Sequence, residues 1–330
     1  MCIRDRTHTP IAIIGAGVAG LAAARQLPPT SYVVFEKSRG PGGRLASKRI
    51  NELRADIGAQ FFTVRDPRFE ETIALASDAG TVRRWSPRMG AFQNGRLVSS
   101  PDKQRRYVGF PYMNSLGHFL AQSVDIRREA RISSVKRDGG AFVLTSTAGE
   151  MYTAEQVLVT APVEQMRELL ADFETDQIAS KFAMEPTWTT VVSSDGQLAA
   201  VDGEIIDACF GGDHEMFDFI SVERSKPGRD SNLIVIHSSP DWAKAHLEDD
   251  PECVSSTMSS MLHEALEIQS SPLVSHRWRY ARPVDPAVTT QKGVYQVDSG
   301  LWIAGDYLAG GRVEGSFLAG IEAAERLKGN

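Results

Sequence analysis

The residues of this chain best suited to chemistry are glycines and acids whose spacing can hold a phosphorylated nucleotide. Gly15, Gly17 and Gly20 form a G-x-G-x-x-G pattern directly after the apolar run 11–14. The first two glycines allow a tight turn that approaches a pyrophosphate, and the third lets helix and strand pack closely. A helix that begins near Val18 would offer free N–H groups and a partial positive charge to the phosphates.

An acidic residue follows at the distance that a nucleotide site requires. Glu36 ends the second apolar run, 32–35, and is placed to accept hydrogen bonds from both hydroxyls of a ribose. Its carboxylate would repel a 2′-phosphate. In the segment Gly42-Gly43-Arg44, the glycines bring main chain against the cofactor, and Arg44 either bridges its phosphates or braces the loop.

A third motif lies near the C-terminus. Asp306 follows the apolar run 301–304, where its carboxylate would bind the hydroxyls of a ribityl chain or cap a helix. A helix that begins near Glu314 would direct its N-terminal dipole at a flavin ring and stabilise negative charge there. Glu314 either belongs to this site or complements its own helix dipole. The three motifs together predict FAD, and because no cysteine lies in them we expect it to bind non-covalently.

The elements that must position these motifs follow from hydrophobic periodicity. The glycine pattern indicates a nucleotide site because a strand–turn–helix–strand order is predicted around it. We expect strands at 11–14, 32–35, 131–136, 141–145, 156–160, 187–193, 232–237, 273–280 and 301–304. We expect helices at 18–27, 67–79, 115–122, 163–171, 251–266 and 314–327.

Composition narrows the classes of partner. The net charge of −6 and pI near 5.7 argue against a nucleic-acid partner. Three widely spaced cysteines without a C-x-x-C pattern indicate a reducing compartment and no metal site. No apolar run reaches membrane-spanning length, and the start lacks the apolar core of a secretion signal. We therefore expect a cytoplasmic protein without a membrane partner, and its oligomeric state stays open.

At this point the residues resemble the FAD-dependent amine oxidase superfamily, and within it the renalase family in its bacterial form. The most specific matching segments are 36–44, 56–66, 224–229, 278–283 and 311–315. A typical amine oxidase has an arginine two residues before its glycine pair. Here that position is Gly40, and Arg39 precedes it, as in renalase-like chains.

The resemblance implies an α/β fold: a Rossmann-like FAD-binding domain of the glutathione-reductase type, with an inserted α+β substrate domain built on a mixed sheet. We expect the FAD-binding domain to be discontinuous, over 10–65, 126–172 and 290–330. The substrate domain would take 66–125 and 173–289. Residues 1–9 are expected to be a disordered or spurious extension, because folding signals begin only at Pro10.

The resemblance also implies a reaction. Renalase-type enzymes oxidise dihydronicotinamide dinucleotides reduced at ring C2 or C6 (2- and 6-dihydro-NAD(P)) to β-NAD(P)+. Flavin N5 takes a hydride, and O2 is reduced to hydrogen peroxide. A dihydropyridine needs no general base, because its ring nitrogen already pushes electrons, so we assign no catalytic side chain. The sequence accordingly shows no triad, carboxylate dyad or metal cluster.

The resemblance carries over to individual residues. The expected cofactor contacts are Gly15, Gly17, Val18, Gly20, Glu36, Lys37, Gly43, Arg44, Ala59, Gln60, Asp306, Val313 and Glu314. Of these, Ala59 and Gln60 are expected to touch the flavin through backbone and amide. The expected substrate contacts are Phe61, Phe62, Thr63, Arg65, Asp102, Thr187 and Arg312.

Several of these residues have a structural alternative. Phe61 and Phe62 would otherwise be core, Arg65 a surface partner of Asp66 or Glu70, and Asp102 a turn residue. Lys226 would match the lysine that holds a water at flavin N5 in some amine oxidases. Because Pro227 and Gly228 follow it, we expect a lysine on a loop surface instead.

Two other functions stay open. One is another enzyme of the same fold, an amine oxidase or a desaturase of a hydrophobic polyene. The other is a flavin-binding protein without turnover. Arg65 with Arg312 suits a phosphorylated substrate better than an amine or a polyene. The preferred isomer, the NAD or NADP form and the physiological electron acceptor are left undecided by the sequence.

Overall fold

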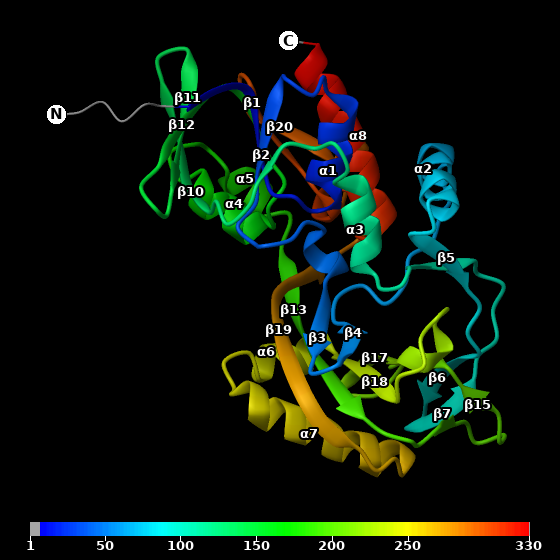
Figure 1. Ribbon diagram of the computed structural model, residues 1–330. Helices are drawn as coiled ribbons and strands as arrows, with labels where there is room; N and C mark the ends of the chain where they lie inside the picture. The colour runs from blue at the N-terminus through cyan, green and yellow to red at the C-terminus, as the bar shows by residue number, and fades with distance from the viewer. Residues whose placement is uncertain (1–6, 330) are drawn as a thin grey trace.

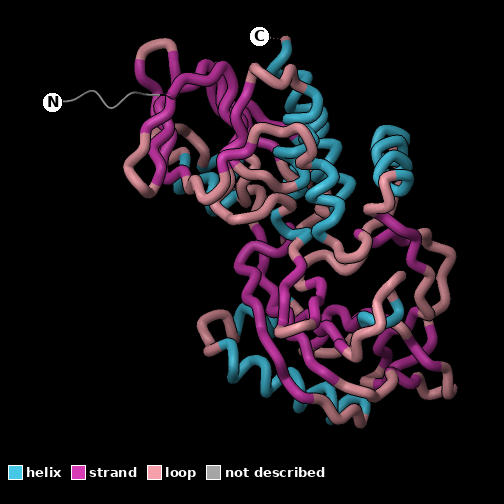
Figure 2. The backbone as a smooth tube through the Cα atoms, in the orientation of Figure 1, coloured by secondary structure: helices cyan, strands magenta, loops and turns pink. Residues whose placement is uncertain are grey.

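Two β-sheets organise the chain, of which the computed structural model describes residues 7–329 (Figure 1). An eight-stranded sheet forms the centre of one body and a seven-stranded sheet the centre of the other. Figure 2 shows the two bodies end to end, joined by several crossings of the chain. This arrangement confirms the predicted α/β class with a Rossmann-like part and a mixed second sheet.

The eight-stranded sheet has the order β10-β11-β12-β1-β2-β9, with β21 and then β20 extending from β12. Its strands are β1 (Thr7–Ile14), β2 (Tyr32–Phe35), β9 (Ile126–Arg127), β10 (Ile132–Asp138), β11 (Ala141–Ser146), β12 (Met151–Val159), β20 (Val294–Asp298) and β21 (Leu301–Ala304). Strands β9, β2, β1, β12 and β21 pair in parallel. Their carboxyl ends therefore meet at one edge, where a parallel sheet binds its ligand.

Helices cover both faces of this sheet. On one face lie α1 (Val18–Gln26), α3 (Asn114–Leu120) and α8 (Val313–Lys328), and on the other lie α4 (Val163–Leu169) and α5 (Asp176–Ala179) (Figure 1). The pair α1 and α8 packs backbone to backbone, because a Cβ on Gly320 would lie 2.2 Å from the carbonyl oxygen of Ala19. Small residues at this contact bring both helix N-termini to the ligand edge.

The second sheet has the order β19-β13-β18-β17-β16-β6-β7. Its strands are β6 (Met89–Gln93), β7 (Arg96–Ser99), β13 (Met184–Ser193), β16 (Ala208–Phe210), β17 (Phe217–Val222), β18 (Leu233–Ser238) and β19 (Ser271–Pro283). Only β16 and β6 pair in parallel, so this sheet is mixed. Helices α6 (Pro240–Ala245) and α7 (Pro251–Leu266) cover one face.

One more helix and six short strands complete the helices and strands of the described chain. They are α2 (Pro67–Asp78), β3 (Ser47–Ile50), β4 (Leu53–Asp56), β5 (Val82–Trp85), β8 (Arg106–Gly109), β14 (Leu198–Ala199) and β15 (Ile205–Ile206). Four single 3-10 turns are η1 (Gly43–Leu45), η2 (Glu223–Ser225), η3 (Gln291–Gly293) and η4 (Asp306–Leu308). Within residues 7–329 no helix is both long and apolar enough to cross a membrane.

The structure differs from the expected division of the chain in three places. Residues 7–9 are not part of an extension, because they begin β1 and pair with β12, while residues 1–6 lie outside the described part. The hairpin β3–β4 packs on the second sheet, where Ala55 and Ile57 share a core with Val235. Helix α3 packs on α1 and against Gly42 in the first body. Sequence reasoning missed these placements because they depend on long-range packing.

Replacement of Gly20 by alanine tests the close packing of α1 on the glycine turn. A Cβ at Gly20 would lie 2.0 Å from the carbonyl oxygen of Gly15, so we expect Gly20→Ala to destabilise the apoprotein by about 1 to 3 kcal/mol. The measurement is urea unfolding. Gly140→Ala is the control, because a Cβ there meets nothing within 4 Å, and it should change stability by less than about 0.5 kcal/mol. Equal stabilities for the two variants would contradict the close packing of Gly20 against the carbonyl of Gly15.

Candidate functional site

The loop after β1 leaves room for a phosphate at the N-terminus of α1. Gly17 is the N-cap of α1, and no side chain caps this helix end. A Cβ on Gly17 would meet nothing within 4 Å, and one on Gly43 would meet only Gly17 Cα, at 3.3 Å. Two glycine segments therefore face each other beside free helix N–H groups, which attract an anion. This space fits the pyrophosphate of the predicted FAD.

Glu36 is held in the position expected for a ribose ligand. The nearly buried carboxylate accepts hydrogen bonds from the N–H groups of Ala16 and Ser38, each at 2.8 Å. Each carboxylate oxygen keeps capacity for a further hydrogen bond. The main chain thus fixes Glu36 at the end of β2, ready to accept two hydroxyl groups.

Arg44 and Asp306 join the second motif to the third. The Arg44 guanidinium donates to both carboxylate oxygens of Asp306, at 2.8 and 2.5 Å, and to the carbonyl of Ala281. Of the two roles foreseen for Arg44, the structure shows that of a loop brace. Burial alone lowers the pKa of Arg44, but the Asp306 charge more than offsets this, and the net pKa shift is upward. Asp306 keeps lone pairs for a ribityl hydroxyl, which stays a prediction.

Glu314 links the third motif to the segment that follows Phe61. Its carboxylate accepts from the N–H groups of Arg65 and Asp66, at 2.6 and 2.8 Å. Glu314 lies in the first turn of α8, as the helix-dipole role requires, and it also holds a neighbouring loop. A contact of Glu314 with the cofactor stays a prediction. The link brings the segment of Arg65 to that of Arg312. Both side chains are exposed, and neither forms an ion pair with a residue in 7–329.

The backbone at Arg312 is unusual. Its φ is 69° and its ψ 159°, a region that non-glycine residues rarely occupy. Such strain costs roughly 1 to 3 kcal/mol and is often found where a side chain must be presented to a ligand. Asp66, one of the two partners foreseen for Arg65, pairs instead with Arg68 at 2.8 Å.

Aromatic side chains from both bodies form a wall next to these motifs. The ring of Phe61 lies 5.6 Å from that of Phe219 and 6.5 Å from that of Phe210, which is 40% exposed. The buried Arg106 stacks over Phe61 at 5.1 Å and is paired with Asp102 at 2.6 Å. Asp102 thus acts on the wall through Arg106. We call Phe61, Phe210 and Phe219 the aromatic wall.

Gln60 and Lys226 differ from their predicted roles. Lys226 is not on a loop surface: it is fully buried and donates to Gln60 at 2.8 Å and Glu223 at 2.5 Å. The Gln60 amide does not face outward, because Lys226 and Ser221 donate to its oxygen. Its nitrogen donates to the main chain of Asp56 and Gly58.

Four buried charges surround this contact. Asp56, Glu223, Lys226 and Arg229 have side chains at most 2% exposed, and each is paired within the group. We call these four residues the buried ion cluster. Burial raises the pKa of Asp56, but Lys226 and Arg229 outweigh it and leave the pKa below its usual value. The cluster is electrically balanced and fixes the segment that leads to Gln60.

Six other predicted contacts lie in different surroundings. Phe62 is core, because it is 3% exposed and stacks on Tyr107 at 5.9 Å; its backbone also bridges to Tyr107. The hydroxyl of Thr187 donates to the carbonyl of Ser238 at 2.6 Å, and Lys37 donates to Gln165 at the surface. Ala59 uses its N–H for the carbonyl of Arg44. Thr63, two residues after Phe61, is half-buried, and so is Val313, the first residue of α8.

Sequence reasoning placed Thr187 of the second sheet at the substrate side but missed Thr189 and His237. His237 on β18 lies between Thr189 and Phe219 in the sheet register, so the three share one face. Phe219 touches Phe61, which places this row at the predicted substrate side. Strand periodicity could have shown that these residues share a face, but not which body covers it. Among the described residues no cluster of three or more His, Cys, Asp or Glu is arranged to hold a metal.

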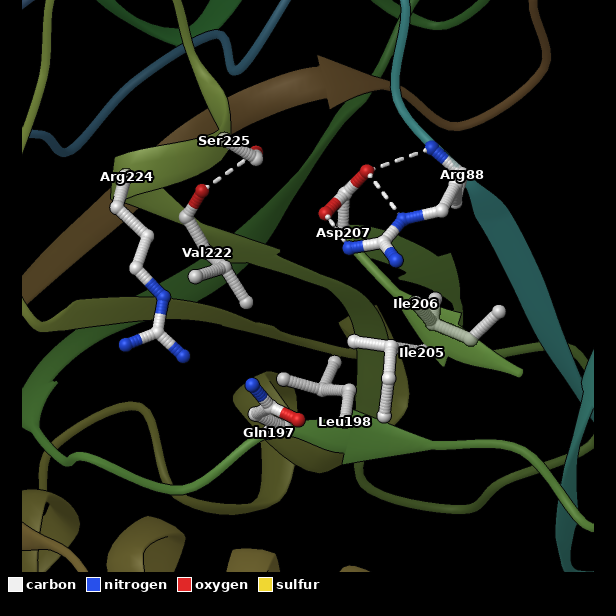
Figure 3. Close-up of a pocket in the computed structure, with 9 residues that line it drawn as sticks. All are labelled: Arg88, Gln197, Leu198, Ile205, Ile206, Asp207, Val222, Arg224 and Ser225. Carbon is white, nitrogen blue, oxygen red and sulfur yellow. Dashed lines mark hydrogen bonds and ion pairs between the residues drawn. The ribbon is translucent and has the colours of Figure 1, made fainter. Parts of the chain in front are cut away.

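A separate cavity of about 210 Å³ lies in the second body (Figure 3). Arg88 and Arg224 lie on opposite sides of it, and Arg88 is paired with Asp207 at 2.8 Å. None of the predicted site residues lines this cavity. It is therefore distinct from the nucleotide edge.

Two family models and several known proteins match this sequence. A family model described as flavin containing amine oxidoreductase matches residues 101–328, and one described as NAD(P)-binding Rossmann-like domain matches 13–74. A Mycobacterium tuberculosis protein named as a flavin-containing monoamine oxidase is 38% identical over 72 residues, 21% of this chain and 15% of that protein. The zeta-carotene-forming phytoene desaturase of Myxococcus xanthus is 41% identical over 64 residues, 19% of this chain and 12% of the desaturase. The chain therefore matches only a small part of the length of these relatives.

Solved structures are similar over nearly the whole chain. A protein of Exiguobacterium sp. 255-15 named as a protoporphyrinogen oxidase has a TM-score of 0.77 at 13% identity, covering 97% of this chain and 98% of that one. A putrescine oxidase solved with putrescine has a TM-score of 0.72 at 13% identity, covering 98% and 100%. At this identity the likeness shows the fold alone.

Replacement of Lys226 by methionine tests the buried ion cluster. The change leaves buried acids without their cation, so we expect it to destabilise the protein by about 3 to 5 kcal/mol. Lys136→Met is the matched control, because Lys136 pairs with Asp172 on the exposed surface, and it should cost less than about 1 kcal/mol. Thermal unfolding of the FAD-free proteins measures both. If Lys226→Met loses no more stability than Lys136→Met, the buried ion cluster contributes little to the stability of the fold.

Proposed function

The chain belongs to the flavin-containing amine oxidoreductase family and is an oxidoreductase with FAD as its cofactor; from this premise we propose that it oxidises 2- and 6-dihydro-NAD(P), as the renalase family does. O2 would be the electron acceptor. The dihydronicotinamide, O2 and one proton would give β-NAD(P)+ and hydrogen peroxide. FAD, when bound, supplies the capacity to take two electrons from the substrate and pass them on.

One observation carries the proposal: two unpaired guanidinium groups lie beside the nucleotide motifs. Arg65 and Arg312 come from segments that the Glu314 hydrogen bonds hold together. Most arginines near the site are neutralised, as Arg44 is by Asp306 and Arg106 by Asp102. Free guanidinium groups bind phosphate in bidentate geometry, so they suit a dinucleotide better than an amine or a polyene.

The aromatic wall supports the same substrate class. Phe61, Phe210 and Phe219 present ring faces and edges, on which a planar heterocycle can stack. The described wall has no unpaired carboxylate that would remove a proton. A dihydropyridine needs none, so the role of these side chains is to orient the ring and exclude water.

The position of Lys226 argues against an amine oxidase arrangement. Its ammonium donates to Gln60 and Glu223 at 2.8 and 2.5 Å and is ion-paired with Asp56 at 3.5 Å. A lysine that held a water at the flavin would need an accessible donor, and this side chain has no exposed surface. The amine oxidase, the desaturase and the non-catalytic flavin protein are therefore outcomes of the first experiment below.

Anaerobic reduction of the bound flavin tests the substrate class. We expect 2- or 6-dihydro-NAD to bleach the visible flavin band rapidly, and ordinary NADH and a simple amine to leave it unchanged, because only the isomers fit the ring orientation required. Stopped-flow absorbance measures this. Bleaching by the amine alone would indicate an amine oxidase, and no bleaching by any of them would overturn the proposal.

Removal of the two free charges tests phosphate binding. We expect Arg65→Gln and Arg312→Gln each to raise the KM for the dinucleotide roughly tenfold, with kcat little changed, because a phosphate contact is made equally in the ground state and the transition state. The effect should shrink at high salt. Arg326→Gln is the control, because Arg326 is paired with Glu322 in the last turns of α8. A KM unchanged in both site variants would contradict this part of the proposal.

A further inference from the structure

The amide of Gln60 has only one orientation that its neighbours allow. Its oxygen lies 2.8 Å from both Lys226 Nζ and Ser221 Oγ, and Lys226 can only donate. Its nitrogen lies 2.6 and 3.0 Å from the carbonyl oxygens of Asp56 and Gly58, which can only accept. A rotated amide would place oxygen against carbonyl oxygen and N–H against ammonium. The NH2 group therefore faces the main chain.

This orientation determines the tautomer of His237. The Nε2 atom of His237 lies 3.3 Å from the Gln60 nitrogen, which carries hydrogens. The two hydrogens already reach the carbonyl oxygens of Asp56 and Gly58. An amide nitrogen accepts no hydrogen bond, so a proton on His237 Nε2 would have no partner there. With the lone pair on Nε2, the ring can share the hydrogen that points to Gly58, and we therefore place the lone pair on Nε2. A neutral imidazole then has its proton on Nδ1. No described residue accepts a hydrogen bond from Nδ1.

His237 stays neutral over the working pH range. Burial, followed by the positive charges of Lys226 behind Gln60 and Arg282 on β19, lowers the pKa of His237 to about 3. Arg282 is itself held by Glu185 on β13 and Asp218 on β17. A further titratable group, His276 on β19, pairs with Thr189 in the sheet register, and burial lowers its pKa. His237 thus offers a fixed N–H donor without a charge.

A second polar group without a partner lies next to it. Thr189 is the direct strand partner of His237, and its side chain is fully buried. Its hydroxyl has no hydrogen-bond partner, which costs free energy unless a ligand satisfies it. A hydroxyl both donates and accepts. The pair therefore presents one donor and one adaptable group on the face that carries Phe219.

We propose that His237 Nδ1–H and the Thr189 hydroxyl bind the carboxamide of the nicotinamide ring. This inference rests on the proposed function, since it names the group of that substrate which the site recognises. His237 would donate to the carboxamide oxygen, and Thr189 would accept from its NH2 group. Both are positioning residues, because they set which ring carbon faces the flavin and take no part in electron transfer. The aromatic wall beside them would take the ring itself.

Nuclear magnetic resonance of 15N-histidine-labelled protein tests the tautomer without any substrate. The His237 signals are identified by their loss in His237→Asn. We expect the pattern of a neutral ring protonated on Nδ1, unchanged between pH 8 and 5. A ring protonated on Nε2, or one that titrates in this range, would overturn the inference.

Ligand binding to the FAD-loaded enzyme tests the recognition. NAD+ and its 3-acetylpyridine analogue, which keeps the carbonyl but lacks the NH2 group, are titrated by the flavin difference spectrum. We expect His237→Phe to weaken both ligands roughly tenfold, and His237→Asn, whose amide can donate from a similar position, to retain most of the affinity. Thr189→Val should weaken NAD+ but leave the analogue unchanged. Thr190→Val is the matched control, because Thr190 points to the opposite face and bonds Ser275.

The outcomes separate this inference from the proposed function. If the dihydro isomers bleach the flavin but His237→Phe binds both ligands as tightly as the unaltered enzyme, the inference is wrong and the function stands. If neither isomer bleaches the flavin, the function fails, and with it the carboxamide assignment. If Thr189→Val lowers the affinity for both ligands equally, Thr189 has a packing role, and the proposed contact with the carboxamide NH2 group is wrong.

Discussion

The buried ion cluster is the constraint on which the geometry of the site depends. Asp56 ends the β3–β4 hairpin, while Glu223, Lys226 and Arg229 belong to the loop after β17 in the second sheet. Buried charges are tolerated only when each finds a partner, so the two segments cannot shift independently. Asp56 also accepts from the main chain of Met113 at 2.8 Å, which adds the start of α3. The cluster therefore fixes where the chain enters the segment Gly58–Gln60.

Two further contacts make one site of motifs from opposite ends of the chain. Arg44 with Asp306 ties the Gly42–Arg44 segment to the end of β21, and Glu314 ties α8 to the loop after the aromatic Phe61. Both contacts consume charges or donors that would otherwise be free for a ligand. What remains at the edge is a small set of groups: the N–H groups of α1, the carboxylate of Glu36, and the guanidinium groups of Arg65 and Arg312.

Electrostatic balance explains why the inner part of the site is neutral while its rim is charged. Lys226 lies behind Gln60 and is neutralised by acids, yet its charge still lowers the pKa of His237. The aromatic wall and His237 thus form an uncharged surface that suits a planar ring. The exposed guanidinium groups of Arg65 and Arg312 suit the phosphates.

The sequence by itself determined the nucleotide edge, because its pieces are local: a strand, a glycine turn, a helix and an acid within a few tens of residues. The fold class followed from that pattern, and the cofactor from the pattern together with the segments around Arg44 and Asp306. The tertiary structure alone decided that Phe62 is core, that Gln60 turns inward and that Lys226 is buried. Gln60 and Lys226 are 166 residues apart, and Gln60 and His237 are 177 apart. Residue type and periodicity record which faces are apolar, but the burial of a polar group depends on which distant partner the fold brings to it.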